Sequence, residues 1–406
     1  MAVGPETFPQ KMFEVAGFEL GTASAGIKTP GRKDVVLMRV CEGASVAGVF
    51  TQNAFCAAPV QICKQHLSEA PARYLVINTG NANAGTGEEG FQDALATCQS
   101  VSTLCNTSIE SVLPFSTGVI GEKLPVEKLV AVLPDAKAAL STDGWNDAAE
   151  GILTTDTRIK GASLQFSYEG KVITLTGISK GSGMIKPNMA TMLGYVATDA
   201  AIAPELLQRL LTDATNCSFN RITVDSDTST NDSCMLVATG ESGLEVSGSN
   251  QELFNVFADA LTQIMQELAH AIVRDGEGAT KFVTVKVESA LNQQEALKTA
   301  FDIAHSPLVK TALFASDPNW GRILAVVGRA EIADLDLDAL QLFLGDVCIV
   351  SKGGRDAGYT EEAGQAVMDG EEILIRVVLN RGDVSETVWT TDLSHDYVSI
   401  NADYRS

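Results

Sequence analysis

A single threonine stands where it could become a nucleophile. Thr191 follows the small residue Ala190, between a loop rich in glycine and proline and an apolar stretch. A threonine hydroxyl inside a chain reacts poorly, because no neighbouring group takes its proton. Cleavage of the Ala190–Thr191 bond would give Thr191 a free α-amine with a pKa of ~8, which could act as the base for its own hydroxyl. The residues alone also allow another interpretation, a loop entering a buried strand with methionines as core filler.

A second pair of residues could stabilise the oxyanion that such a nucleophile generates. Acyl transfer needs hydrogen-bond donors directed at the developing negative charge. Thr117 offers a hydroxyl, and Gly118 offers a backbone N–H that a substrate can approach closely. Taken alone, the pair is equally typical of an ordinary turn between a strand and a helix.

Two charged residues in glycine-rich segments are candidates for binding a charged substrate. Lys180 precedes the turn 181–183 and can pair with a carboxylate, whereas Glu277 lies in the segment 275–278 and can meet an ammonium group. Each of them is also compatible with a solvated loop, which is where lysine and glutamate usually lie. The residues therefore indicate only that a ligand with both charges could be accommodated.

The segment 177–200 resembles the signature of the ornithine acetyltransferase family of arginine biosynthesis. Further likeness to this family recurs along the chain in the segments 48–53, 57–60, 76–85, 115–121, 154–157, 274–281, 317–322 and 400–404. These segments occur in the family's order and span most of the 406 residues, so the resemblance is specific.

The resemblance implies a self-processing acetyltransferase. Members of the family are glutamate N-acetyltransferases that cleave themselves at the Ala-Thr bond, so residues 1–190 would form an alpha chain and residues 191–406 a beta chain. Acetyl would pass from N-acetylornithine to glutamate through acetyl-Thr191, by ping-pong kinetics in the cyclic arginine pathway. No metal or organic cofactor is expected, and acetyl-CoA remains open as a second acetyl donor. The family also implies a heterotetramer of two alpha and two beta chains.

The resemblance also assigns roles to individual residues. It makes Ala190 and Thr191 the cleavage site, Thr191 the nucleophile, and Thr117 and Gly118 the oxyanion hole. It implies that the substrate-binding residues are Thr154, Lys180, Thr191, Glu277, Asn401 and Ser406. Since Asn401 and Ser406 lie in the last six residues, where chains usually fray, this assignment requires the C-terminus to fold over the pocket instead.

Composition and charge argue against some classes of protein, among them nucleic-acid-binding proteins and proteins that span a membrane. The net charge of −22 and the pI of about 4.5 argue against a nucleic-acid partner, which needs clustered lysine and arginine. The eight cysteines include no CxxC pair and no signal segment follows Met1, so reduced thiols in a cytoplasmic protein are expected. No apolar run reaches the ~18 residues of a membrane span.

Local patterns predict an α+β protein. Alternating apolar residues on either side of Glu169-Gly170 predict a β-hairpin that leads to residue 180. Pro204 begins a helix, and Ser249–Glu252 resembles a capping box that opens a longer one. Strands are predicted at 345–350, 372–379 and 385–391, with Arg381–Asp383 as a hairpin turn between the last two. The resemblance refines this class to a layered α/β sandwich of the self-processing N-terminal-nucleophile-like type, with two interleaved segments.

Three alternatives remain open from the sequence. Residues 85–90 fit the spacing GxGxxG and suggest a nucleotide-dependent oxidoreductase, although two glutamates would face the pyrophosphate. A self-processing aminopeptidase or amidase of similar fold would share the chemistry of Thr191. A non-catalytic acidic binding protein would keep an intact chain.

Overall fold

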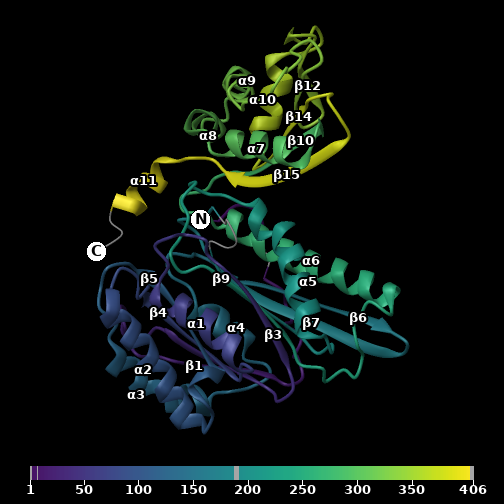
Figure 1. The fold of residues 1–406 in the computed structure, drawn as a ribbon. Helices are drawn as coiled ribbons and strands as arrows, with labels where there is room; N and C mark the ends of the chain where they lie inside the picture. The colour runs from purple at the N-terminus through teal and green to yellow at the C-terminus, as the bar shows by residue number, and fades with distance from the viewer. Residues whose placement is uncertain (1, 7, 187–191, 403–406) are drawn as a thin grey trace. The chain divides into compact units, whose positions relative to one another are not determined.

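The computed structural model describes residues 2–6, 8–186 and 192–402, and these residues form three mixed β-sheets with helices packed against them (Figure 1). Parallel and antiparallel strand pairs occur together, and strands and helices do not alternate regularly along the chain. The α+β class predicted from the sequence is confirmed.

The first sheet has the strand order β1-β2-β4-β5, in which only β4 and β5 are parallel. Its strands are β1 (Phe18–Ala23), β2 (Val35–Val40), β4 (Tyr74–Asn81) and β5 (Val112–Val119). One face is covered by helices α1 (Ala58–Glu69), α2 (Gly87–Cys105) and α3 (Val126–Ala138). Successive β2 residues alternate between two cores, with Val35 and Leu37 on the helix-covered face and Val36 and Met38 on the other.

The second sheet has the order β3-β9-β8-β7-β6 and shares its core with the first. Its strands are β3 (Ser45–Phe50), β9 (Ser233–Ala238), β8 (Leu193–Thr198), β7 (Lys171–Lys180) and β6 (Lys160–Tyr168). Side chains of both sheets meet in one cluster with helix α4 (Trp145–Gly151), and Phe115 of β5 contacts Tyr195 of β8 edge to face. Helices α5 (Pro204–Asn216) and α6 (Gln251–Arg274) pack on this sheet, completing a layered sandwich.

Both parts of the chain flanking the predicted cleavage point contribute to the second sheet. Strands β8 and β9 follow residue 191 and lie between β3 and β7, which precede it. The predicted interleaving is therefore confirmed, whereas the division into residues 1–190 and 191–406 as separate chains stays a prediction.

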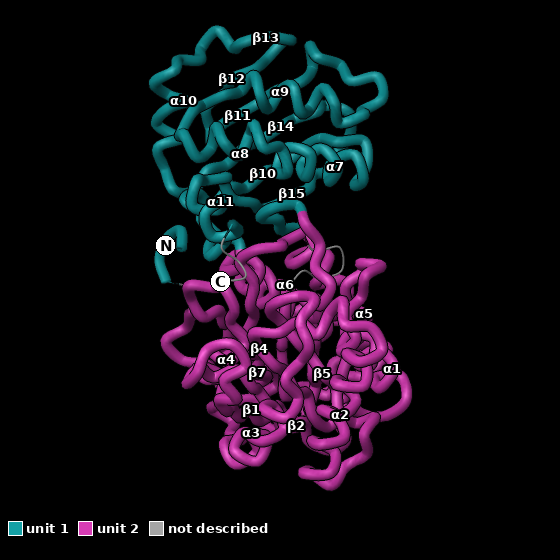
Figure 2. The backbone as a smooth tube through the Cα atoms, turned by 90° about the vertical axis from the view of Figure 1, so that its left-hand side faces the viewer, with its two compact units in different colours: residues 1–6, 221–226, 273–406 teal, residues 7–220, 227–272 magenta. Residues whose placement is uncertain are grey.

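The folded chain divides into two compact units. These are unit 1 (residues 1–6, 221–226 and 273–406) and unit 2 (residues 7–220 and 227–272), as Figure 2 shows.

Unit 1 contains a six-stranded sheet with the order β13-β12-β11-β14-β10-β15. Its strands are β10 (Phe282–Ala290), β11 (Gln341–Leu344), β12 (Val347–Ser351), β13 (Gly354–Arg355), β14 (Glu372–Val378) and β15 (Val384–Thr391). The helices of this unit are α7 (Gln293–Ala304), α8 (Pro307–Phe314), α9 (Trp320–Gly328), α10 (Glu361–Met368) and α11 (His395–Ala402). The hairpin predicted around Arg381–Asp383 is wrong, because β10 pairs with both β14 and β15 and so lies between them.

Other local predictions are confirmed with small shifts. The hairpin of β6 and β7 turns at Glu169-Gly170, and α5 begins at Pro204. Helix α6 begins one residue later than the capping box implies, because Asn250 Oδ1, and not a Ser249 oxygen, accepts the Leu253 N–H at 3.1 Å. All eight cysteines carry free thiols. Among the described residues, every helix is too short or too polar to cross a bilayer.

Candidate active site

The predicted oxyanion pair lies at the end of β5, in unit 2. Gly118 has φ +135, and a Cβ there would stand 2.2 Å from the carbonyl carbon of Gly80 on the parallel strand β4. Only glycine fits this position, because the neighbouring backbone leaves no room for a side chain. Thr117 is 8% exposed, so its hydroxyl lies in a largely water-excluded setting. Such a setting strengthens any hydrogen bond that Thr117 makes to a developing charge.

Lys180 contacts the Thr117 hydroxyl directly. It is the last residue of β7, and its Nζ donates to Thr117 Oγ1 at 3.2 Å. A hydroxyl that accepts a hydrogen bond from an ammonium group directs its own proton elsewhere, where it can donate to an oxyanion. The structure therefore brings together two residues that are 63 positions apart in the chain.

A buried carboxylate that the sequence analysis did not single out organises the neighbouring backbone. Asp156 accepts hydrogen bonds from the Thr154 N–H at 3.0 Å and the Gly181 N–H at 2.7 Å. It also forms an ion pair with Lys160 at 2.6 Å, and the two side chains are 0% and 1% exposed. Asp156 thus ties the segment of Thr154 to the residue that follows Lys180. The one feature of the sequence that could have pointed to Asp156 is its place as a single carboxylate among the threonines of 154–157.

The charge state of Asp156 follows from its surroundings. Burial by itself would raise the pKa of this carboxyl, but the ammonium charges of Lys160 and Lys180 and the hydrogen bonds it accepts outweigh burial. The pKa of Asp156 is therefore held well below its usual range, and the group is ionised at neutral pH.

Asp156→Asn is expected to lower the free energy of unfolding by about 3–5 kcal/mol at pH 7, because it removes the carboxylate that faces the buried Lys160 ammonium. A carboxyl with a lowered folded-state pKa contributes stability that is present above its unfolded pKa and lost as the pH falls below about 4. The difference in the free energy of unfolding between wild type and Asp156→Asn should therefore become smaller at acidic pH. Urea unfolding at pH 7 and at lower pH measures it.

Asp147→Asn provides the matched control for this substitution. Asp147 also pairs with a lysine, Lys33, at 2.7 Å, but its side chain is 62% exposed. Exposed pairs contribute only about 0–1 kcal/mol, so this variant should be nearly neutral. Equal effects of the two substitutions would contradict the organising role of Asp156.

Two predicted substrate-binding residues meet in unit 1. Glu277 lies between α6 and β10 and is 8% exposed, and its Oε2 accepts a hydrogen bond from Asn401 Nδ2 at 2.8 Å. Asn401 lies on α11, so the chain forms a helix as far as Ala402 instead of fraying. Three predicted residues, Ala190, Thr191 and Ser406, lie outside the described residues.

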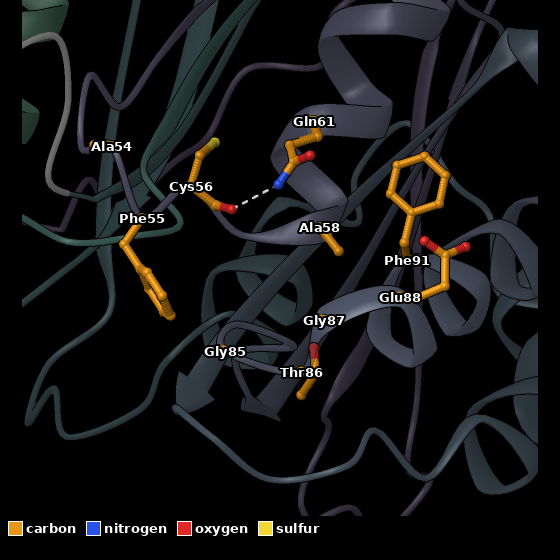
Figure 3. Close-up of a pocket in the computed structure, with 10 residues that line it drawn as sticks. All are labelled: Ala54, Phe55, Cys56, Ala58, Gln61, Gly85, Thr86, Gly87, Glu88 and Phe91. Carbon is orange, nitrogen blue, oxygen red and sulfur yellow. Dashed lines mark hydrogen bonds between the residues drawn. The ribbon is translucent and has the colours of Figure 1, made fainter.

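A separate pocket of about 360 Å³ lies in unit 2 at the first turns of α1 and α2 (Figure 3). Gly85, Thr86 and Gly87 line it together with Glu88, whose carboxylate stands in the first turn of α2. A dinucleotide site requires this helix start to receive a pyrophosphate, which the Glu88 and Glu89 carboxylates would repel. The structure therefore gives no support to the oxidoreductase alternative.

Comparison with known proteins decides the family. A sequence model of the ArgJ family matches residues 19–406. The chain belongs to the ArgJ family. The "arginine biosynthesis bifunctional protein ArgJ" of Pseudomonas fluorescens is 60% identical over 407 residues, covering 100% of both chains. The resemblance drawn from the sequence is confirmed, and with it the assignment as an acetyltransferase of arginine biosynthesis.

Two solved structures are also similar to this chain. The arginine biosynthesis bifunctional protein of Bacillus halodurans is 38% identical, covers 50% of this chain and 95% of its own, and has a TM-score of 0.48. An ornithine acetyltransferase from Mycobacterium tuberculosis, solved with ornithine, is 34% identical, covers 43% of this chain and 94% of its own, and has a TM-score of 0.39.

Proposed function

We propose that this member of the ArgJ family transfers acetyl from N-acetylornithine to glutamate through Thr191, after cutting itself at the Ala190–Thr191 bond. The observation that carries the proposal is the contact between Lys180 and the Thr117 hydroxyl. In the strand register, Lys180 pairs with Leu193, the second residue after Thr191 in the chain. The predicted cation thus lies beside the strand that follows the nucleophile and contacts the predicted oxyanion donor.

Self-cleavage is the first step of the proposed mechanism. Thr191 Oγ attacks the Ala190 carbonyl carbon, and the bond from that carbon to the Thr191 nitrogen breaks, leaving an ester. Water hydrolyses the ester and releases the carboxyl group of Ala190. The freed α-amine of Thr191 then takes the proton of its own hydroxyl in later cycles.

Acetyl transfer uses the same chemistry, with the acetyl group of N-acetylornithine in place of the Ala190 carbonyl and glutamate in place of water. Thr191 Oγ attacks the acetyl carbonyl of N-acetylornithine, ornithine leaves as the amine, and the acetyl ester of Thr191 then passes to the amine of glutamate. The Thr117 hydroxyl and the Gly118 N–H donate to the oxyanion in both halves. A glycine at position 118, required by its contact with Gly80, lets the reacting carbonyl approach the backbone closely.

Charged and polar residues would hold the amino-acid part of each substrate. Lys180 suits a carboxylate, Glu277 suits an ammonium group, and Thr154, Asn401 and Ser406 add polar contacts. The name of the Pseudomonas fluorescens relative, a bifunctional protein, supports acetyl-CoA as a second acetyl donor in the same ping-pong scheme. The chains would assemble as two alpha and two beta subunits.

A denaturing gel and an acetyl-transfer assay test the proposal together. Purified protein should separate into residues 1–190 and 191–406. It should form N-acetylglutamate from N-acetylornithine, and acetyl-CoA should be assayed as donor separately. An intact chain without transfer would refute the mechanism. Net hydrolysis of peptides or amides, without transfer to glutamate, would favour the aminopeptidase alternative.

A further inference from the structure

One carboxylate in unit 1 joins the two segments that carry Glu277 and Asn401. Asp392 is 4% exposed and follows the last residue of β15. Its Oδ1 accepts the N–H groups of Thr280 and Lys281 at 2.8 and 2.9 Å, and its Oδ2 accepts the Thr280 hydroxyl at 2.7 Å. Three charge-assisted hydrogen bonds therefore hold the end of β15 to the chain three residues after Glu277.

The same two segments also pack closely next to Glu277. Gly278 has φ +69, and a Cβ at this position would lie 2.4 Å from the Tyr397 nitrogen and 2.6 Å from Ser394 Oγ. The backbone of the Glu277 loop therefore lies against the first turn of α11. Because α11 begins only three residues after Asp392, the position of Asn401 depends on where that carboxylate holds the chain.

Lys310 secures the end of β15 from another helix. It lies on α8 and is 4% exposed. Its Nζ donates to Thr390 Oγ1 at 3.1 Å and to the Thr391 carbonyl oxygen, and its own carbonyl accepts the Leu393 N–H at 3.2 Å. The residues on both sides of Asp392 are thus fixed, so its carboxylate is a rigid anchor for the loop of Glu277.

We propose that Asp392 is a positioning residue that keeps Glu277 and Asn401 at hydrogen-bonding distance, so that Glu277 presents its carboxylate to the ammonium group of an amino-acid substrate. This assignment rests on the proposed function for the role of Glu277. Asp392 acts through the segment that carries Glu277, because its carboxylate accepts three hydrogen bonds from Thr280 and Lys281.

The test compares Asp392→Ala, Glu277→Gln and the double variant. Each single substitution is expected to raise the KM for N-acetylornithine about tenfold, as for the loss of one hydrogen bond to a charged group, with little change in kcat. Because both substitutions act on the Glu277 carboxylate, the KM of the double variant should exceed the KM of Glu277→Gln by less than about threefold. Asp392→Asn keeps an oxygen that can accept from the two N–H groups. Its KM should therefore lie between those of wild type and Asp392→Ala.

Controls separate positioning from general destabilisation. Ile349→Ala removes a fully buried side chain from β12 of the same unit, so it should lower the Tm and leave KM unchanged. Any one of three results would overturn the assignment. These are a KM in the double variant that is raised by the product of the two single effects, an unchanged KM in Asp392→Ala, and a raised KM in Ile349→Ala.

Ornithine binding by calorimetry repeats the comparison without turnover. Wild-type protein that binds ornithine but transfers no acetyl would contradict the proposed function while leaving this test of Asp392 intact. Ornithine affinity that is equal in wild type and Asp392→Ala would overturn the positioning role by itself. Failure of the wild type to bind ornithine would overturn both.

Discussion

Thr191→Ala is expected to remain a single chain of 406 residues and to transfer no acetyl. One hydroxyl performs both reactions in the proposed mechanism, so its removal abolishes the chain break and the acetyl-enzyme together. The measurement is a denaturing gel of the purified protein, followed by an assay of N-acetylglutamate formation.

Thr191→Ser is the matched control because it keeps an oxygen nucleophile and, after cleavage, an α-amine. It should process itself, more slowly if loss of the methyl group loosens the hydroxyl, and should retain transfer activity. Fully cleaved and active Thr191→Ala protein would refute the role of this residue.

Thr117→Ala is expected to lower kcat roughly a hundredfold or more, with little change in KM. Loss of one oxyanion donor typically costs ~3 kcal/mol of transition-state stabilisation, because the donor is directed at charge that develops only during reaction. In the structure the Thr117 hydroxyl accepts from Lys180 at 3.2 Å, which leaves its proton to donate. Steady-state kinetics with varied N-acetylornithine measure both constants.

Thr117→Ser keeps the hydroxyl and serves as the control, so most of the turnover should return. Self-cleavage passes through the same kind of oxyanion and should slow in Thr117→Ala as well. A raised KM with unchanged kcat would instead make Thr117 a substrate-binding residue and place the oxyanion hole elsewhere.

Local elements were predictable because their signals are short-range. The alternation on either side of Glu169-Gly170 sets the register of a hairpin, and the apolar face of α6 repeats at helical spacing. The order of strands was not predictable in the same way. Residues 381–383 look like a hairpin turn, yet β10, about 100 residues upstream in the chain, lies between the two strands they connect.

The sequence by itself determined the family and the candidate residues, because the motif around Thr191 and its companions identify the chemistry without any coordinates. Only the tertiary structure showed that Lys180 contacts Thr117 and that Glu277 meets Asn401, across 63 and 124 positions of the chain. It alone revealed Asp156 and Asp392 as the carboxylates that hold these segments. The physical reason is that a buried aspartate acts through whichever donors folding brings to it. Gly181 lies 25 positions from Asp156, and Thr280 and Lys281 lie 112 and 111 positions from Asp392.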